Sequence, residues 1–287
     1  MNKSAPQPAK AQATRKSVIA ELWPGQSLDL LKALHILTRE GELNADSRRK
    51  LKQVLHLVQL LRPALDRAFE RKSDLRLADL GAGKSYLGFI LYDLIFAKRE
   101  DGNVIAVEAR AELIEAARDL ATRASFSRMS FLSGQIEDIN CPHEIDVVTA
   151  LHACDTATDE AIRFALRHQA RTIALVPCCQ AELARLLEGE GTHSLHQLWR
   201  HPIQRREFAS VTTNAIRALF LEAHGYKVRV TELVGLEHSM KNELILAERH
   251  QLSNAAAKAE LIALLRQLPV HPALVADFVP SAASNPG

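Results

Sequence analysis

The sequence predicts an α/β fold, in which a mostly parallel sheet of seven strands is covered by helices on both faces. From residue 72 onward, short apolar segments of strand length alternate with segments of helical periodicity, which is typical of a parallel sheet with helical crossovers. The last two predicted strands, 227–233 and 243–247, follow one another without a helix. They should therefore pair antiparallel at the edge of the sheet.

The other five strands are expected from apolar runs that contain few charges. They span 75–80, 104–107, 129–132, 145–151 and 172–176. Strands buried on both faces have such continuous apolar runs. Helices are predicted over 86–97, 111–122, 156–168, 181–187, 208–224 and 253–268.

Two helices are predicted ahead of the first strand. Ser27 can cap a helix with leucines at helical spacing, and Gly41 stands where a C-terminal cap belongs. A second helix should begin near Asn44 or Ser47, and Pro63 should end or kink it. One face of this helix is apolar, and the segment 48–56 on the other face is basic.

The composition indicates a folded cytoplasmic protein. The chain has 287 residues, of which 47% are hydrophobic, and a formal net charge of +2. We expect a disordered tail over 1–22, a helical segment over 23–71, the α/β domain over 72–250, and a C-terminal helix with a loose tail over 251–287. No apolar run approaches the roughly 20 residues that span a bilayer. Four cysteines are too few for a disulfide framework in a chain of this size.

A glycine loop links the first strand to the first crossover helix. It reads Asp79-Leu80-Gly81-Ala82-Gly83-Lys84. Glycines allow the backbone to approach a ligand closely, and the N–H groups at the start of the helix can bind an anion. About 25 residues later Glu108 ends the second strand, where a carboxylate can accept hydrogen bonds from both ribose hydroxyls.

Together these features predict binding of S-adenosyl-L-methionine in a Rossmann-like methyltransferase sheet. The methionine carboxylate would lie on the loop of Gly81, Gly83 and Lys84, and Asp79 would balance the ammonium group. Gln135 and Ile136, after the third strand, are expected at the adenine. Leu151, at the end of the fourth strand, completes the expected cofactor contacts.

Other glycine-loop folds match less well. A dinucleotide-binding loop requires a third glycine where this chain has Tyr86, and a P-loop requires one where it has Ala78. Asp79 would also place negative charge next to phosphates. A glycine turn that binds no ligand remains the alternative.

The methyl acceptor is expected beyond the ends of the fourth and fifth strands. The sequences there are His152-Ala153-Cys154 and Cys178-Cys179, and the carboxyl ends of neighbouring parallel strands form the ligand crevice of open α/β sheets. His152 is the candidate base for a hydroxyl acceptor. Cys178 could instead attack a pyrimidine ring, the cysteines could bind a metal, or they could pack as small buried residues. Of these, we expect a catalytic role for Cys178 and no metal.

Two further segments could contact the acceptor. Lys241 and Asn242 lie between the last two strands and should come to the same edge. The stretch from Trp199 to Arg206 is basic with one aromatic residue, and it could contact a phosphate backbone or remain solvated.

These motifs together resemble a methyltransferase-domain family that includes the eukaryotic acceptor-stem tRNA 2′-O-methyltransferases. The resemblance rests on the glycine-loop segment 77–84, on 151–154, on the cysteine pair and on Lys241-Asn242. It implies that Lys52, Gln53 and His56 of the basic helix face the pocket. Ser85, Asp155 and Gln180 depart from the family's usual residues, and the zinc modules of some tRNA relatives are absent.

The resemblance implies an enzyme that methylates RNA with S-adenosyl-L-methionine. The alternatives are a small-molecule or protein acceptor, or a non-catalytic adaptor of the same fold that binds the cofactor or RNA. No obligate protein partner and no membrane association are expected.

Overall fold

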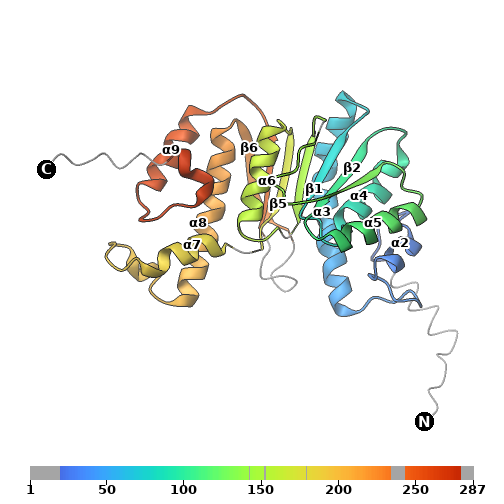
Figure 1. Cartoon of the computed structure of the whole chain (residues 1–287), viewed down its shortest axis with the longest axis horizontal. Coiled ribbons are helices and arrows are strands. Elements are labelled where there is room, and N and C mark those ends of the chain that lie inside the picture. Colours follow the sequence, from blue (N-terminus) through green and yellow to red (C-terminus); the bar gives the residue numbers. More distant parts are fainter. Residues whose placement is uncertain (1–19, 142, 152, 179, 234–242, 279–287) are drawn as a thin grey trace, which may run out of the picture.

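The computed structural model describes residues 20–141, 143–151, 153–178, 180–233 and 243–278. Seven strands form one sheet in the order β3-β2-β1-β4-β5-β7-β6 (Figure 1). The strands are β1 (Arg76–Leu80), β2 (Asn103–Glu108), β3 (Met129–Ser133), β4 (Val147–Leu151), β5 (Thr172–Val176), β6 (Tyr226–Glu232) and β7 (Glu243–Arg249). Strands β1 to β5 pair in parallel, whereas β7 is antiparallel to both β5 and β6. The predicted fold class is therefore confirmed.

Helices cover both faces of this sheet (Figure 1). One layer contains α2 (Leu28–Ala33), α3 (Ala45–Arg71), α4 (Tyr86–Leu94) and α5 (Ala111–Arg123). The other contains α6 (Thr156–Arg167), α8 (Pro202–Ala223) and α9 (Ala255–Leu265), and the short α7 (Ala181–Leu186) packs on α8. Short 3-10 turns lie at Phe96–Lys98, Leu187–Gly189, His196–Leu198 and Ala273–Phe278.

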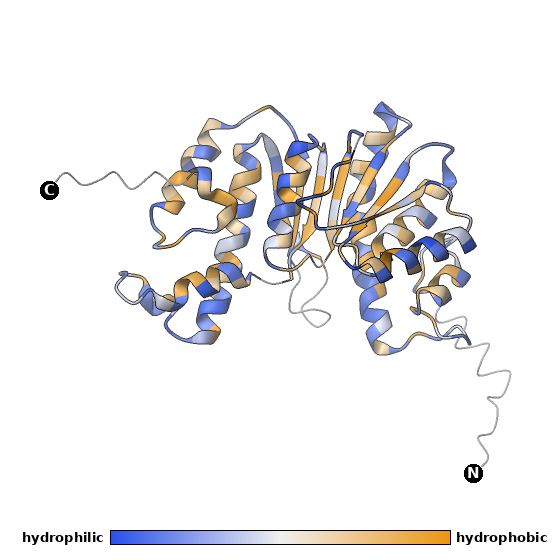
Figure 2. Ribbon diagram, in the orientation of Figure 1, coloured by the Kyte–Doolittle hydropathy of each residue, from blue (hydrophilic) through white to orange (hydrophobic). Residues whose placement is uncertain are grey.

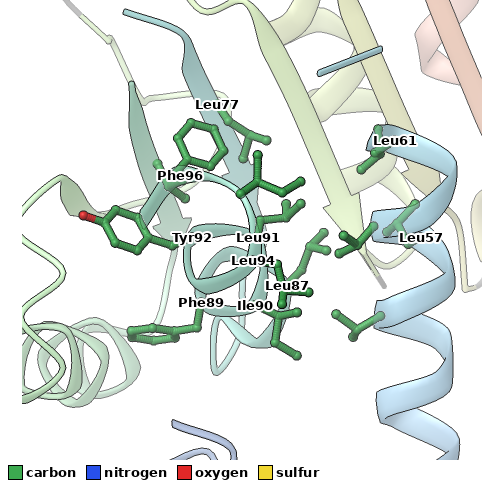
Figure 3. Close-up of a cluster of buried hydrophobic side chains, with 14 of the residues drawn as sticks. Leu57, Leu61, Leu77, Leu87, Phe89, Ile90, Leu91, Tyr92, Leu94 and Phe96 are labelled. Atoms are coloured by element: carbon green, nitrogen blue, oxygen red, sulfur yellow. The ribbon is translucent and has the colours of Figure 1, made fainter. Parts of the chain in front are cut away.

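Apolar side chains of α4 fill the space between the sheet and α3. Leu91 and Phe89 are fully buried, and Figure 3 shows α4 side chains facing Leu57 and Leu61 of α3. Burying an aliphatic or aromatic side chain contributes about 1.5–3 kcal/mol, so this contact fixes α3 on the domain. The outer helix faces are hydrophilic while the strands are hydrophobic (Figure 2).

Of the predicted helix boundaries in the N-terminal region, one is wrong, and one of the two alternatives at the other is excluded. Ser27 does cap α2, since its side chain accepts a hydrogen bond from the N–H of Leu30, but the helix ends at Ala33 and does not extend to Gly41. His35 then has a positive φ of 55°, which breaks the helix. Pro63 does not end α3, which continues to Arg71 because the residues on both sides of the proline are held in the core.

The other predicted elements are found, most of them with shifted ends, whereas β5 has the predicted bounds of 172–176. Helix α8 begins at Pro202 rather than near residue 208, because proline suits the first turn, where its missing N–H has no partner to lose. The strand expected over 145–151 begins at Val147, and the helix expected over 253–268 is α9, capped by Asn254.

Chain direction places two helix starts beside the carboxyl ends of the strands. Only residues 72–75 separate α3 from β1, so α3 runs back along the sheet and its first turns lie at the edge where β1 ends. Helix α8 precedes β6 in the same way, with a turn at Gly225. Strand β6 runs parallel to β5, because both are antiparallel to β7. Both helices therefore begin at the edge where ligand sites are expected.

Candidate active site

The glycine loop after β1 has a backbone that only small residues adopt easily. Gly81 and Gly83 have φ angles of +62° and +57°, within the left-handed region that disfavours a side chain. The Ala82 N–H donates to the Val107 carbonyl at 2.9 Å, which ties the loop to the end of β2. The loop is therefore held open ahead of α4, with its backbone available to a ligand.

Asp79 lies buried at the end of β1, with 2% of its surface exposed. Its Oδ1 accepts a hydrogen bond from the Thr149 hydroxyl on β4 at 2.9 Å. Burial raises the pKa of Asp79 to about 7, although the bonds from Thr149 and from the Gly88 backbone lower it. No cation pairs with this carboxylate among the described residues, so a ligand ammonium group would supply the missing charge.

Glu108 at the end of β2 lies against the glycine loop. One carboxylate oxygen accepts from the Gly83 N–H at 2.7 Å, and the other accepts from the backbone N–H and the Nε of Arg110, at 3.2 and 2.8 Å. Burial raises the pKa of Glu108, but the bonds from Arg110 and Gly83 outweigh it and lower the pKa below its usual value. The carboxylate is thus ionised and oriented. It still has lone pairs for further donors such as ribose hydroxyls.

The site fits S-adenosyl-L-methionine in two respects. The buried Asp79 carboxylate lacks a cation, and the Ser85 hydroxyl beside it is buried without a hydrogen-bond partner in the described part of the chain. A donor molecule with an ammonium group and carboxylate oxygens could satisfy both groups. When bound, it would supply a methyl group on a positively charged sulfur.

Three of the remaining predicted cofactor residues follow or end the strands β3 and β4. The Gly134 N–H donates to the Glu108 carbonyl at 3.1 Å, which brings the segment of Gln135 and Ile136 next to Glu108. Gln135 is exposed, and Ile136 is buried in the core beneath. Leu151 is half-buried.

Lys84 is placed elsewhere. Its exposed side chain lines a separate pocket of about 290 Å³ between α2, α4 and α5, together with Leu34, Tyr86 and Leu113. Of the basic helix, Gln53 is buried in α3, whereas Lys52 is exposed and His56 half-buried.

The predicted acceptor edge is described only in part. Cys154 and Cys178 lie together, with their Sγ atoms 2.7 Å apart. Cys154 is exposed and Cys178 is half-buried. His152, Cys179, Lys241 and Asn242 lie outside the described residues.

A buried polar network that we did not predict supports this edge. Arg217 of α8, 1% exposed, donates through Nε to Asp159 at 2.6 Å and through Nη2 to the Asp155 carbonyl at 2.8 Å. It also donates to Asn214, which bonds Glu243 at the start of β7 and accepts from Gln180 at 3.4 Å. Three segments at the acceptor edge are thus connected to one guanidinium.

The missed residues had weak sequence signals. Thr149 is the one hydroxyl in the apolar run of β4, and a polar residue in a buried strand requires a partner. Arg110 follows Glu108 by two residues, which suits a local ion pair. Trp199 is not the surface aromatic that its basic surroundings predict. It is 1% exposed and packs on Phe208, and its indole N–H donates to the Glu190 carbonyl, so the ring can be buried without an unsatisfied donor.

Within the described ranges, no group of three or more His, Cys, Asp or Glu side chains could hold a metal ion. No helix in the same part of the chain is both long and apolar enough to cross a membrane.

Comparison with known proteins supports one class of domain. Residues 49–186 match the model of a family described as "Methyltransferase domain". This match includes the glycine loop, Glu108 and the acceptor edge up to α7. No protein of curated function matches the sequence significantly.

Solved structures with a similar arrangement have low sequence identity. A methyltransferase from Podospora anserina, bound to S-adenosylhomocysteine, is 11% identical over 88% of this chain and 100% of its own, with a TM-score of 0.47. A putative O-methyltransferase from Klebsiella pneumoniae is 18% identical over 83% of this chain and 97% of its own, with the same TM-score. An rRNA methylase from Streptococcus thermophilus is 11% identical over 62% and 88%, with a TM-score of 0.41.

Proposed function

The chain is an S-adenosyl-L-methionine-dependent methyltransferase, with residues 49–186 matching a methyltransferase-domain family, and from this premise we propose that it methylates a tRNA-like RNA. The observation that carries the proposal is the charge beside the acceptor edge. Exposed cations lie on the first two turns of α3 and α8, two of the helices that begin there.

On α3 the cations share one face. Arg49 and Lys52 are spaced by three residues, which places both along one side of the helix, and His56 follows on that side four residues later. Arg49 and Lys52 are exposed, and neither belongs to an ion pair among the described residues. On the opposite side of the edge, Arg206 of α8 is exposed as well. Cations on both sides of an acceptor site suit a polyanion longer than one nucleotide.

The proposed roles follow the strand ends. Asp79 holds the donor's ammonium group, the N–H groups of the glycine loop hold its carboxylate, and Glu108 accepts from its ribose hydroxyls. Alignment of the acceptor with the methyl group is the main catalytic task in such a displacement. A ribose hydroxyl must also lose its proton, and we propose His152 as the base, with Cys178, Lys241 and Asn242 positioning the acceptor.

The test measures transfer of a tritiated methyl group from S-adenosyl-L-methionine to three separate fractions: total RNA, protein and small metabolites. We expect label in RNA, and in tRNA-sized RNA most of all. Label in protein or metabolites without label in RNA would refute the proposal.

Charge variants then test the surface. Arg49→Ala with Lys52→Ala should raise the KM for RNA about tenfold and flatten its salt dependence by roughly one unit of slope per lost phosphate contact. The matched control is Arg71→Ala with Lys98→Ala, two exposed cations at the opposite edge of the sheet, which removes the same charge. Equal effects of the two pairs would show that α3 does not contact RNA.

A further inference from the structure

We propose that Cys154 and Cys178 form a reversible disulfide that links the loops after β4 and β5. Their Sγ atoms lie 2.7 Å apart, so an approach of less than about 1 Å would give the S–S bond length of about 2.0 Å. The two residues come from neighbouring parallel strands. Leu151 pairs with Val176 at the last register position, and each cysteine follows within three residues.

The surrounding contacts hold the two loops together. The Asp155 carboxylate, next to Cys154, accepts from the Glu182 N–H at 2.8 Å and from Arg185 at 3.0 Å, and both donors belong to α7 after the Cys178 loop. Arg217 holds the Asp155 carbonyl from beneath. Asp155 itself has a φ of 52°, an unusual backbone for a non-glycine residue. The sulfurs are therefore brought together by a network and not by a flexible chain.

Exposure determines which sulfur reacts first. Cys154 is exposed and Cys178 half-buried, whereas Cys141 is buried at 5% exposure in the core. A hydroperoxide would oxidise the Cys154 thiolate to a sulfenic acid, and the peroxide's other oxygen would leave as water or alcohol. The Cys178 thiolate would then attack the sulfenic sulfur, forming the S–S bond and releasing water. Two thiols and one hydrogen peroxide thus give one disulfide and two waters.

The consequence for activity rests on the proposed function. The crosslink would fix the loops on which the acceptor is placed, whereas the proposed donor contacts, Asp79 and Glu108, lie on β1 and β2. The oxidised enzyme should therefore bind S-adenosyl-L-methionine as before and transfer its methyl group more slowly.

Peptide mapping tests the bond without requiring any activity. The full chain is treated with hydrogen peroxide, alkylated and digested with trypsin and a glutamate-specific protease. Trypsin gives residues 129–163 and 172–185, and cleavage after Glu144 separates Cys141 from Cys154. After both proteases we expect residues 145–160, which contain Cys154, linked through Cys178 to residues 172–182, and both peptides separate after dithiothreitol.

Variants and activity complete the test. Cys154→Ser should abolish the link, while Cys141→Ser should leave it intact. A disulfide between Cys178 and Cys179, or no link at millimolar peroxide, would overturn the proposal. In the wild type, turnover should fall at least fivefold on oxidation and return with dithiothreitol. If the link forms but turnover does not change, the bond has no regulatory effect, and the RNA proposal is unaffected.

Discussion

The Asp79 carboxylate is buried beside a hydroxyl. Its ionisation in this site should lower the free energy of unfolding of the cofactor-free protein by a measurable amount. Burial raises its pKa from 3.8 to about 7 in the folded protein. Between these values the folded state binds a proton that the unfolded state does not, so the free energy of unfolding falls as pH rises through this range. Above about pH 7 the penalty is complete and constant.

Asp79→Asn should therefore stabilise the cofactor-free protein at pH 8 but not at pH 4. The amide is never charged, but it keeps one acceptor oxygen where the carboxylate had two for the donors Thr149 and Gly88, so the gain at pH 8 should be on the order of 1–3 kcal/mol. Urea denaturation at both pH values measures it. The same variant should lose most of its affinity for S-adenosyl-L-methionine in calorimetry. If the variant were less stable than the wild type at pH 8, ionisation of the buried Asp79 would not destabilise the folded protein.

Among the structural elements, the turn between α8 and β6 depends most on a glycine. Gly225 has a φ of +85°, and a Cβ there would lie 2.2 Å from the Gln251 carbonyl oxygen. Gly225→Ala should lower the free energy of unfolding by about 2–4 kcal/mol, since it adds a clash to the backbone strain. Gly41→Ala is the matched control, because Gly41 has a φ of +86° and no atom within 4 Å of its added Cβ.

The control should cost only about 1–2 kcal/mol of backbone strain. Urea denaturation of the two variants isolates the effect of the contact with Gln251. Equal losses would show that residues 250–252 move away without cost.

At this scale the sequence predicted the order and type of the elements well and their ends less well. All seven strands, and the antiparallel edge pair, could be predicted because apolar runs and the missing crossover are local patterns. Packing against the core carries α3 through Pro63, which local propensity cannot show. In the site, Asp79 and Glu108 were predictable from strand ends. Arg217 was not, because its partners lie up to 62 residues away.

For the molecule as a whole, Arg217 connects α8 to the loop after β4 and, through Asn214, to β7. Burial raises the pKa of its partner Asp159, and the Arg217 charge lowers it in part. Removing one member of a buried ion pair leaves the other charge uncompensated. Arg217→Met should therefore lower the free energy of unfolding by about 3–5 kcal/mol, as measured by urea denaturation.

A second replacement tests whether the uncompensated Asp159 charge causes this loss of stability. Asp159→Leu in the Arg217→Met background removes the stranded carboxylate and should restore part of the lost stability. No recovery would indicate that the bonds from Arg217 to Asp155 and Asn214 matter more than the ion pair.

The sheet order has a consequence for how such an enzyme changes over evolutionary time. Apart from Leu151 of β4, the proposed donor contacts come from β1, β2 and the loop after β3, while the acceptor edge is built by β4, β5, β7 and the helices that pack on them. Mutations can therefore accumulate on one half of the molecule while the other half keeps its contacts. Related enzymes with this sheet order can therefore change their methyl acceptor while they retain the residues that bind the methyl donor.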